Sequence, residues 1–153
     1  MDDTVNDVIV PYWTTRKAKW LLEVWSNETH SYVSLHLESK GQYFRRYGDT
    51  LPRRIAYALL RDLRDAQKLL TWSPQNRLVW FFLRSPTLFR QCPDYALRLW
   101  DPHGNQYGSV TIHPALVKHR WILRLTRSDA RLFVDDLAAA VAIAERLEKG
   151  SLP

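Results

Sequence analysis

Short segments in which apolar and polar residues alternate predict strands in the first half of the chain. In the clearest of them, Val33, Leu35 and Leu37 alternate with polar or amphipathic residues, which is typical of a strand with one buried face. Turn-rich stretches such as NETH and KGQ separate the segments. Pro11 limits the first of them to a sheet edge or a bend. The predicted strands are 6–13, 18–26, 31–39 and 42–47, and GDT is expected to stop the last one.

After residue 50 the apolar spacing changes to three and four, which predicts a helix over residues 53–70. Thr50 is its expected N-cap, and Pro52 suits its first turn. One face of this helix is apolar and carries Ile55, Leu59, Leu63, Ala66 and Leu70. Much of the remaining surface is basic, with Arg53, Arg54, Arg61, Arg64 and Lys68.

The second half repeats this plan. Its predicted strands are 77–85, 95–101, 106–113 and 119–126. The segment with Pro86, Cys92 and Pro93 is expected to be a loop. Ser128 is the expected N-cap of a final helix over 129–148, with Gly150 beyond its end. Its predicted apolar stripe is Leu132, Leu137, Val141, Ala144 and Leu147, and its predicted solvated face includes Asp135 and Asp136.

The inferred order, ββββα–ββββα, predicts an α+β fold in which one helix covers each antiparallel sheet. The 153 residues fit a single domain with a pseudo-repeat of 7–71 and 77–149. The repeat is one of pattern, without residue-level identity between the halves. Two such units can share one core.

Positive charge is concentrated in the middle of the chain. The net charge is +6, while residues 77–127 alone carry +6 and residues 53–76 carry +3; the two ends are slightly acidic. The sequence pI of about 9.7 is typical of nucleic-acid-binding domains. Such asymmetry favours a surface that faces a polyanion, although ordinary solubility charge is the alternative.

The strand-to-helix segment WILRLTRSDARLFVDDLAAAVAIAERL (121–147) resembles the last strand and helix of the plant Whirly proteins. RKAKWLL (16–22) is loosely similar to their lysine-rich motif, without its glycine. The resemblance implies two ββββα units with roughly perpendicular sheets, and binding of single-stranded DNA. The transcriptional positive cofactors, with one such unit per chain, and the guide-RNA-binding proteins of kinetoplastid mitochondria share this fold.

Aromatic residues interleaved with basic ones on the predicted strands are suited to single-stranded nucleic acid, because bases stack on rings and cations follow the phosphates. We expect Trp20, Trp80 and Trp121 in the core, whereas Trp25, Trp100 and Tyr43 fit either the core or an exposed face. The residues predicted to form the nucleic-acid platform are Lys17, Lys19, Trp25, Tyr32, His36, Tyr43, Arg45, Arg98, Trp100, Tyr107, Arg120 and Arg124.

Catalytic signals are weak. The five histidines have no metal-binding spacing, the single Cys92 has no evident partner base, and no nucleotide-binding glycine motif occurs. No apolar run is long enough to span a membrane, and the acidic N-terminus does not resemble a signal peptide. We therefore expect a cytoplasmic protein that is not an enzyme and needs no cofactor.

The leading hypothesis is a single-stranded DNA- or RNA-binding protein of low sequence specificity, acting in transcription, replication or DNA transfer. The alternative is a protein–protein module, a regulatory or inhibitory factor that docks on an acidic partner through exposed Trp and Arg. A small-ligand enzyme or sensor is a third option. The resemblance to these families also implies association through helices, and Leu132, Val134, Val141 and the alanines of LAAAVAIA would leave a surface small enough for the close approach of a second copy, so we expect a homo-oligomer.

Overall fold

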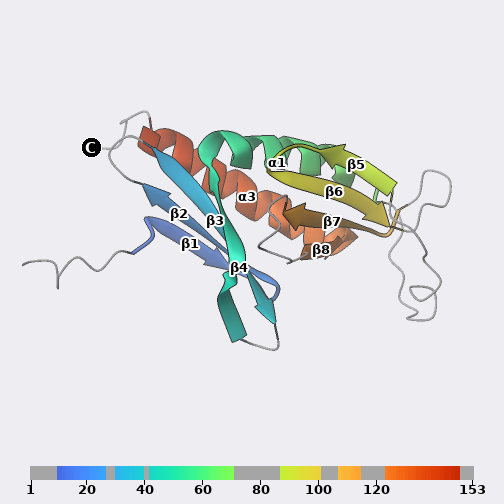
Figure 1. Ribbon diagram of the computed structural model, residues 1–153. Helices are drawn as coiled ribbons and strands as arrows, with labels where there is room; N and C mark the ends of the chain where they lie inside the picture. Colours follow the sequence, from blue (N-terminus) through green and yellow to red (C-terminus); the bar gives the residue numbers. More distant parts are fainter. Residues whose placement is uncertain are drawn as a thin grey trace, which may run out of the picture.

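The computed structural model describes residues 10–26, 30–39, 42–70, 87–100, 107–114 and 123–148. These residues form two four-stranded antiparallel sheets, each followed along the chain by one helix (Figure 1). The first unit consists of β1 (Trp13–Arg16), β2 (Trp20–Ser26), β3 (Ser31–Ser39), β4 (Gln42–Pro52) and α1 (Arg53–Gln67). The second unit consists of β5 (Thr87–Gln91), β6 (Tyr95–Trp100), β7 (Ser109–Pro114), β8 (Leu123–Thr126) and α3 (Arg127–Glu148). The predicted α+β class with two ββββα units is confirmed.

In both sheets the strands lie in chain order, and each is antiparallel to its neighbours. The β3–β4 ladder contains one irregularity, because His36 pairs with Gly48 while the next residue, Leu37, pairs with Phe44. Extra residues on one strand bend it and increase its twist. Within the described residues, the one parallel contact is an isolated bridge between Leu70 and Tyr107.

Inward-facing strand residues follow the predicted alternation and are almost inaccessible to solvent. They are Leu22, Val24, Val33 and Leu35 in the first sheet, and Leu97, Leu99, Val110, Ile112, Leu123 and Leu125 in the second. From α1 the core receives Leu59, Leu63 and Ala66, which lie on the predicted apolar stripe. Fully burying one such aliphatic side chain contributes about 1.5–3 kcal/mol, so these positions fix which face of each element points inward.

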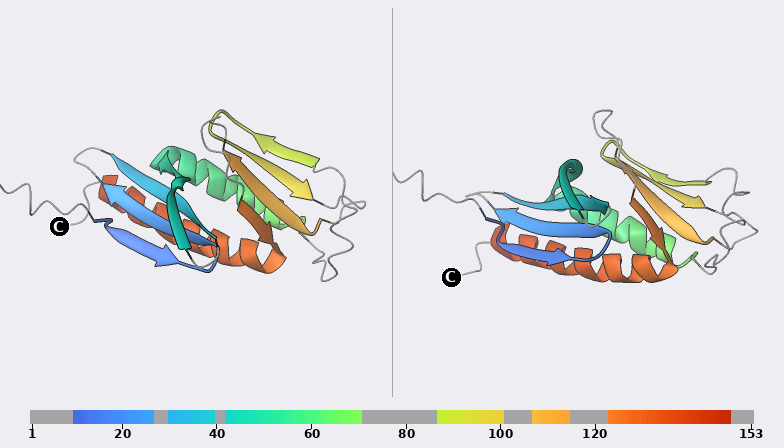
Figure 2. Two further views of the ribbon diagram at one scale, coloured as in Figure 1. Left: turned by 60° about the horizontal axis from the view of Figure 1, so that its bottom comes forward. Right: turned by 90° about the horizontal axis from the view of Figure 1, so that it is seen from below.

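The last helix, α3, packs against the first sheet as well as against β8 (Figures 1 and 2). On β2, the Trp20 ring is 1% exposed and meets Phe133 edge-to-face, with centroids 5.1 Å apart. Its indole Nε1 donates a hydrogen bond to Asp136 Oδ2 over 3.0 Å. The helix of the second unit therefore completes the core of the first.

The phase of α3 differs from the predicted stripe in one respect. Leu132 is 45% exposed, and the neighbouring Phe133 is the buried residue, because Phe133 packs on Trp20. Val134 and Val141, expected on an oligomer surface, are buried within the chain itself. These two valines therefore belong to the core of the chain, whereas Leu132 is exposed, and the homo-oligomer stays a prediction.

The C-terminal end of α3 is tied to the first unit by Glu148. Its Oε2 accepts a hydrogen bond from the Ser31 backbone N–H over 3.1 Å and lies 2.8 Å from Ser31 Oγ. Its Oε1 accepts from Arg53 Nε at the start of α1 over 2.9 Å. Burial alone raises the pKa of Glu148, but the hydrogen bonds from Ser31 and Arg53 and the Arg53 charge outweigh it and hold the pKa below its ordinary value.

The first strand lies later in the chain than the predicted segment 6–13. β1 begins at Trp13, beyond Pro11, and pairs with β2 through a tight connection closed by Lys17 N–H and the Trp20 carbonyl. Residues 1–9 lie outside the described part of the chain. The edge strand WTTR shows no alternation of apolar and polar residues, so the sequence pattern did not predict its pairing with β2.

The predicted end of β4 and the predicted cap of α1 are both wrong. Gly48 and Asp49 continue the strand, because their backbones pair with β3 across the irregularity. Thr50 still belongs to β4, and its Oγ1 lies 3.1 Å from Ser34 Oγ. The helix therefore starts directly after Pro52 without a side-chain cap. It ends at Gln67 rather than at residue 70.

A strand occupies part of the predicted loop in the second half. β5 (Thr87–Gln91) pairs with β6 around a turn in which Cys92 N–H donates to the Tyr95 carbonyl over 2.9 Å. Pro86 and Pro93 flank this edge strand without interrupting it. The predicted strand 77–85, with Trp80, lies outside the described residues, as does Trp121.

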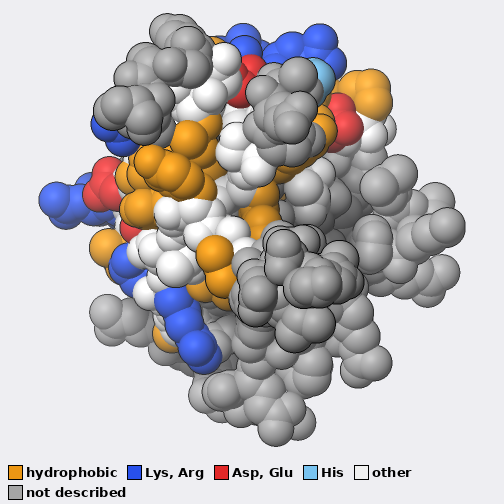
Figure 3. Space-filling view, turned by 90° about the vertical axis from the view of Figure 1, so that its left-hand side faces the viewer, with side chains coloured by type: hydrophobic (Ala, Val, Ile, Leu, Met, Phe, Trp, Pro, Cys, Tyr) orange, Lys and Arg blue, Asp and Glu red, His pale blue; other side chains and the backbone are white. Residues whose placement is uncertain are grey.

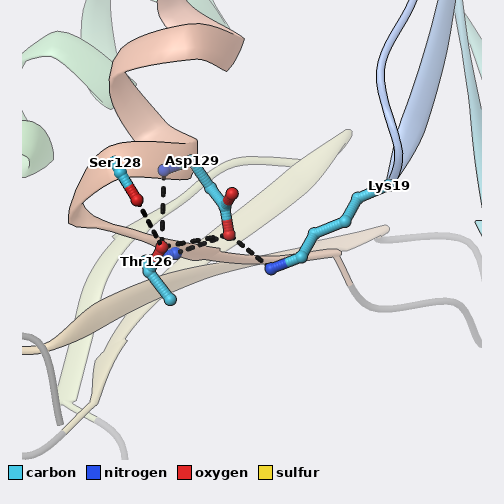
Figure 4. Close-up of polar contacts among 4 residues, drawn as sticks. All are labelled: Lys19, Thr126, Ser128 and Asp129. Atoms are coloured by element: carbon cyan, nitrogen blue, oxygen red, sulfur yellow. Dashed lines mark hydrogen bonds and ion pairs between the residues drawn. The ribbon is translucent and has the colours of Figure 1, made fainter. Parts of the chain in front are cut away.

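The cap of α3 is Thr126 rather than Ser128 (Figure 4). Thr126 Oγ1 accepts a hydrogen bond from the Asp129 N–H over 3.4 Å, and Asp129 Oδ2 accepts from the Thr126 N–H over 3.4 Å. This reciprocal arrangement is a capping box, with Asp in the position where Glu is usual. Since β8 ends at Thr126, the strand passes into the helix without an intervening loop.

Candidate nucleic-acid interface

Two arginines project from the outer face of the second sheet in a single cross-strand row. In this row Arg98 on β6 faces Thr111 on β7, and Thr111 faces Arg124 on β8. Both arginines are exposed, while Thr111 between them is fully buried. The strand alternation that sends Leu97, Leu99 and Leu125 inward sends these cations outward.

Trp100 lies one position further along the same face and is held in place by two contacts. Its Nε1 donates a hydrogen bond to Thr111 Oγ1 over 2.7 Å. The Arg124 guanidinium lies over its ring, 5.0 Å from the centroid, in a cation–π geometry. The indole is therefore fixed in orientation, and an arginine forms part of the same surface.

His113 extends this group toward the end of β7. Its Nε2 lies 2.7 Å from Thr111 Oγ1, so the hydroxyl links the indole to the imidazole. Burial, followed by the positive charge of Arg98, lowers the pKa of His113 below its ordinary value of 6.5. The imidazole is consequently neutral at pH 7 and can act as a hydrogen-bond acceptor.

The outer face of the second sheet carries no acidic residue among its described strand positions. The outward positions are Leu88, Gln91, Ala96, Arg98, Trp100, Ser109, Thr111, His113, Arg124 and Thr126. Arg98 also has no ion pair within the part of the chain that the structure describes. The face thus combines positive charge, one ring and several hydroxyls.

The outer face of the first sheet has different chemistry. Trp25 on β2 and Tyr32 on β3 are direct cross-strand partners, and both are half-buried. Beside them His36 Nε2 lies 3.0 Å from Glu23 Oε1. On the surface that faces the viewer in Figure 3, hydrophobic side chains form a patch, and Lys and Arg side chains lie mostly around it. Trp25, Tyr32 and His36 therefore lie together as predicted, next to a carboxylate.

Lys17 and Lys19 do not belong to either outer face, contrary to the prediction. Both lie in the connection between β1 and β2 and reach toward α3. Lys17 Nζ is 3.1 Å from Asp136 Oδ2, and Lys19 forms an ion pair with Asp129 (Figure 4). Asp136 is therefore not on a solvated face, whereas Asp135 is exposed as predicted. Nothing in the local sequence indicated that α3 would bring carboxylates to this connection, because Asp136 lies 119 residues beyond Lys17 in the chain.

Tyr107 is also misplaced in the prediction. It precedes β7, forms the isolated bridge with Leu70 at the end of the α1 region, and packs against the hydrophobic core. It is therefore not part of the outer face. Tyr43 and Arg45 belong to β4 by their backbone, but their side chains lie outside the description, and Arg120 lies outside the described residues altogether.

Three residues of these faces were missed as site residues: Glu23, Thr111 and His113. Their strand parity signals them, because Thr111 and His113 alternate with buried Val110 and Ile112, and Glu23 alternates with Leu22 and Val24. The alternation of residues along a single strand does not predict that Thr111 contacts both Trp100 and His113. That contact depends on the β6–β7 register.

Within the described residues no group of three or more His, Cys, Asp or Glu side chains is placed to hold a metal ion. Neither described helix is long and apolar enough to cross a membrane. No protein-family model matches this sequence, and no curated protein matches it significantly.

Proposed function

We propose that this protein binds single-stranded nucleic acid, with little sequence specificity, through the outer face of the second sheet. The observation that carries the proposal is the row Arg98–Thr111–Arg124 with Trp100 packed beneath Arg124. Cations that follow the phosphates and rings that accept bases are the two components of a sequence-tolerant single-strand site. The exposed arginines on β6 and β8, one on each side of β7, supply the cations, and the Trp100–Arg124 pair supplies a planar surface for the bases.

The charge of the chain supports this choice of partner. The net charge is +6, and the segment 77–127, which contains all four strands of the second sheet, has a net charge of +6 by itself. Among the described strand positions of the outer face, no carboxylate lies beside Arg98 and Arg124. We further propose that the two ββββα units are related to the fold of the Whirly proteins and transcriptional positive cofactors.

The test is the salt dependence of binding to single-stranded oligonucleotides. Affinity should fall steeply with salt because each neutralised phosphate releases counterions. Replacing Arg98 and Arg124 together by Ala should reduce the slope of log K against log salt by about one to two units, roughly one for each lost phosphate contact. The loss should be similar for different sequences, since phosphates carry no base identity.

The matched control is the double variant Arg54→Ala with Arg131→Ala, which removes the same charge from exposed positions on α1 and α3. It should leave the slope almost unchanged. Equal effects of the two double variants would show that net charge, and not this face, governs binding. The sheet-face proposal would then be wrong.

Trp100 provides a second, independent readout. Trp100→Ala should weaken binding by about 1–3 kcal/mol through lost stacking. Trp100→Phe keeps a ring and loses the hydrogen bond to Thr111, so it should retain most of the affinity. If the two variants weaken binding equally, the ring does not stack with a base.

A protein–protein module is the second candidate, and the exposed face of α1 favours it. Tyr57 is 49% exposed and lies beside Arg61 and Arg64 around a hollow of about 340 Å³. Tyr and Arg are frequent hot spots in interfaces. This function predicts no oligonucleotide binding at about 50 mM salt, together with binding to an acidic protein that is lost in Arg61→Ala/Arg64→Ala.

A further inference from the structure

We propose that the hollow on the outer face of the first sheet is a pocket for a single nucleobase, and that it favours guanine. The hollow has a volume of about 260 Å³ and is lined by Glu23, Trp25, Tyr32, Ser34, His36 and Thr50. It is separate from the arginine row on the second sheet. The inference rests on the proposed function and adds to it a position where one base of the bound strand is distinguished.

Register on three neighbouring strands brings these side chains together. Trp25 on β2 is paired with Tyr32 on β3, and the next outward pair along the same strands is Glu23 with Ser34. Ser34 is in turn paired with Thr50 on β4, and their hydroxyl oxygens lie 3.1 Å apart. Two aromatic side chains therefore adjoin a group of polar ones.

The polar part of the hollow is dominated by a buried carboxylate. Glu23 is only 6% exposed, and its Oε1 lies 3.0 Å from His36 Nε2. A carboxylate accepts hydrogen bonds and donates none, and each of its oxygens can accept more than one. A ligand that lies here must supply N–H groups. A phosphate is excluded, because its charge would be placed next to that of Glu23.

The aromatic pair and the volume define the rest of the ligand. Trp25 and Tyr32 line the hollow, and aromatic side chains on strands are the residues on which bases stack. A volume of about 260 Å³ lies below the range of about 300–1,000 Å³ that is usual for drug-sized ligands, so one ring system fits and a complete nucleotide does not.

Among the bases, guanine supplies the best match to a carboxylate. Its ring N1–H and exocyclic N2–H₂ are adjacent donors on one edge and can engage the two oxygens of Glu23. Cytosine and adenine offer an amino group next to a ring acceptor, which the carboxylate repels. Thymine and uracil offer a single ring N–H between two carbonyls. Hydrogen bonding to a charged group makes the difference between these bases large enough to measure.

The test uses nucleosides, which carry no phosphate, and therefore does not depend on capture of a strand by the second sheet. Guanosine should perturb the indole N–H resonance of Trp25 in nuclear magnetic resonance spectra, with saturation. Inosine, which lacks only the N2 amino group, should bind at least about tenfold more weakly, as expected for loss of one hydrogen bond to a carboxylate. Thymidine should bind more weakly still. Equal affinities for guanosine and inosine, or no perturbation of Trp25, would overturn the pocket.

Glu23→Gln should reduce the preference for guanosine over inosine to about twofold or less, because an amide presents only one acceptor atom to the guanine edge. Glu145→Gln on α3 removes a carboxylate that does not line the hollow and should leave the preference intact. If Glu23→Gln retains the tenfold preference, another group reads the base and the assignment to Glu23 is wrong. The comparison of guanosine with inosine uses the wild-type protein. It therefore tests the guanine pocket even if the Glu23→Gln variant folds poorly.

Oligonucleotides separate this inference from the proposed function. Guanosine binding without oligonucleotide binding would reject the proposed function and support the pocket. Oligonucleotide binding that is unchanged when every guanine is replaced by hypoxanthine would support the proposed function and reject the pocket. Binding of guanine-containing strands that weakens about tenfold on this replacement would support both.

Discussion

The two sheets are built by the same strand order, yet their basic residues have different partners. In the first unit Lys17, Lys19 and Arg53 form ion pairs with Asp136, Asp129 and Glu148, all on α3. In the second unit Arg98 and Arg124 project from the outer face of the sheet. On β5, however, Arg90 Nε lies 3.3 Å from Asp62 Oδ1 on α1, so basic residues of both units join the two halves of the molecule. Arg98 and Arg124 differ from all of these because they form a candidate binding surface.

The position of α3 explains this difference. The helix follows β8 in the chain but also packs against β1, β2 and β3, so Asp129, Asp136 and Glu148 come within reach of basic residues of the first unit (Figure 2). The nearby lysines then have carboxylate partners within reach. The outer face of the second sheet points away from that contact, and its cations stay exposed to solvent and to ligands.

The largest expected effect tests whether α3 completes the first core. Trp20→Ala should lower the free energy of unfolding by about 3–5 kcal/mol, because a fully buried ring packed on Phe133 is removed. Trp25→Ala, on the same strand but on the outer face, should cost less than half as much. Urea denaturation of both variants measures this. Similar losses would mean that the two faces of β2 are equally important for stability.

The second prediction concerns neighbouring aspartates on α3. Asp136→Ala should cost about 1–3 kcal/mol, because the buried indole N–H of Trp20 loses its acceptor and Lys17 loses its ion pair. The adjacent Asp135 is exposed, and Asp135→Ala should change stability by no more than about 0.5 kcal/mol. The comparison is measured by chemical denaturation. If Asp135→Ala lowers the free energy of unfolding as much as Asp136→Ala does, the contacts of Asp136 with Trp20 and Lys17 do not contribute specifically to stability.

A smaller effect should appear in acid. The pKa of Glu148 in the folded protein lies below its ordinary value of 4.5, so the folded state favours the ionised carboxylate. Its contribution is complete above about pH 4.5 and is lost as pH falls through the folded pKa. Because the side chain is partly exposed, we expect less than about 1 kcal/mol. Denaturation from pH 6 to 3 should show a shallower decline in Glu148→Gln, while Asp135→Asn, at an exposed position on the same helix, should follow the wild type.

The smallest expected change in stability involves His113 in the second sheet. It occurs at a higher pH than the change that involves Glu148. The pKa of His113 in the folded protein is below 6.5, so the unfolded chain binds the proton more readily. Stability associated with the neutral imidazole is complete above about pH 6.5 and declines as pH falls toward the folded pKa. His113→Gln should remove this decline and change stability at pH 7 by about 0.5 kcal/mol or less. A wild-type stability that is flat from pH 7 to 5 would contradict the coupling of His113 to its surroundings.

Local pattern in the sequence determined the larger part of the architecture. Alternation with a period of two identified β2, β3, β6, β7 and β8, and spacing of three and four identified both helices, because burial of one face imposes those periods on any amphipathic element. The same alternation placed Arg98, Trp100 and Arg124 on one outer face. The position of excess positive charge in the middle of the chain also followed from the sequence alone.

The tertiary structure decided which partner each polar group has. Lys17 and Asp136 are 119 residues apart, and Trp20 and Asp136 are 116 apart, so no local pattern connects them. The sequence predicted Thr50 and Ser128 as caps, but pairing with β3 holds Thr50 within a strand, and Thr126 at the end of β8 caps α3 instead of Ser128. Phe133 instead of Leu132 is buried because Trp20 is there to meet it. Periodicity specifies which way a side chain points relative to its own element, whereas its contacts depend on where packing of the whole core brings the other elements.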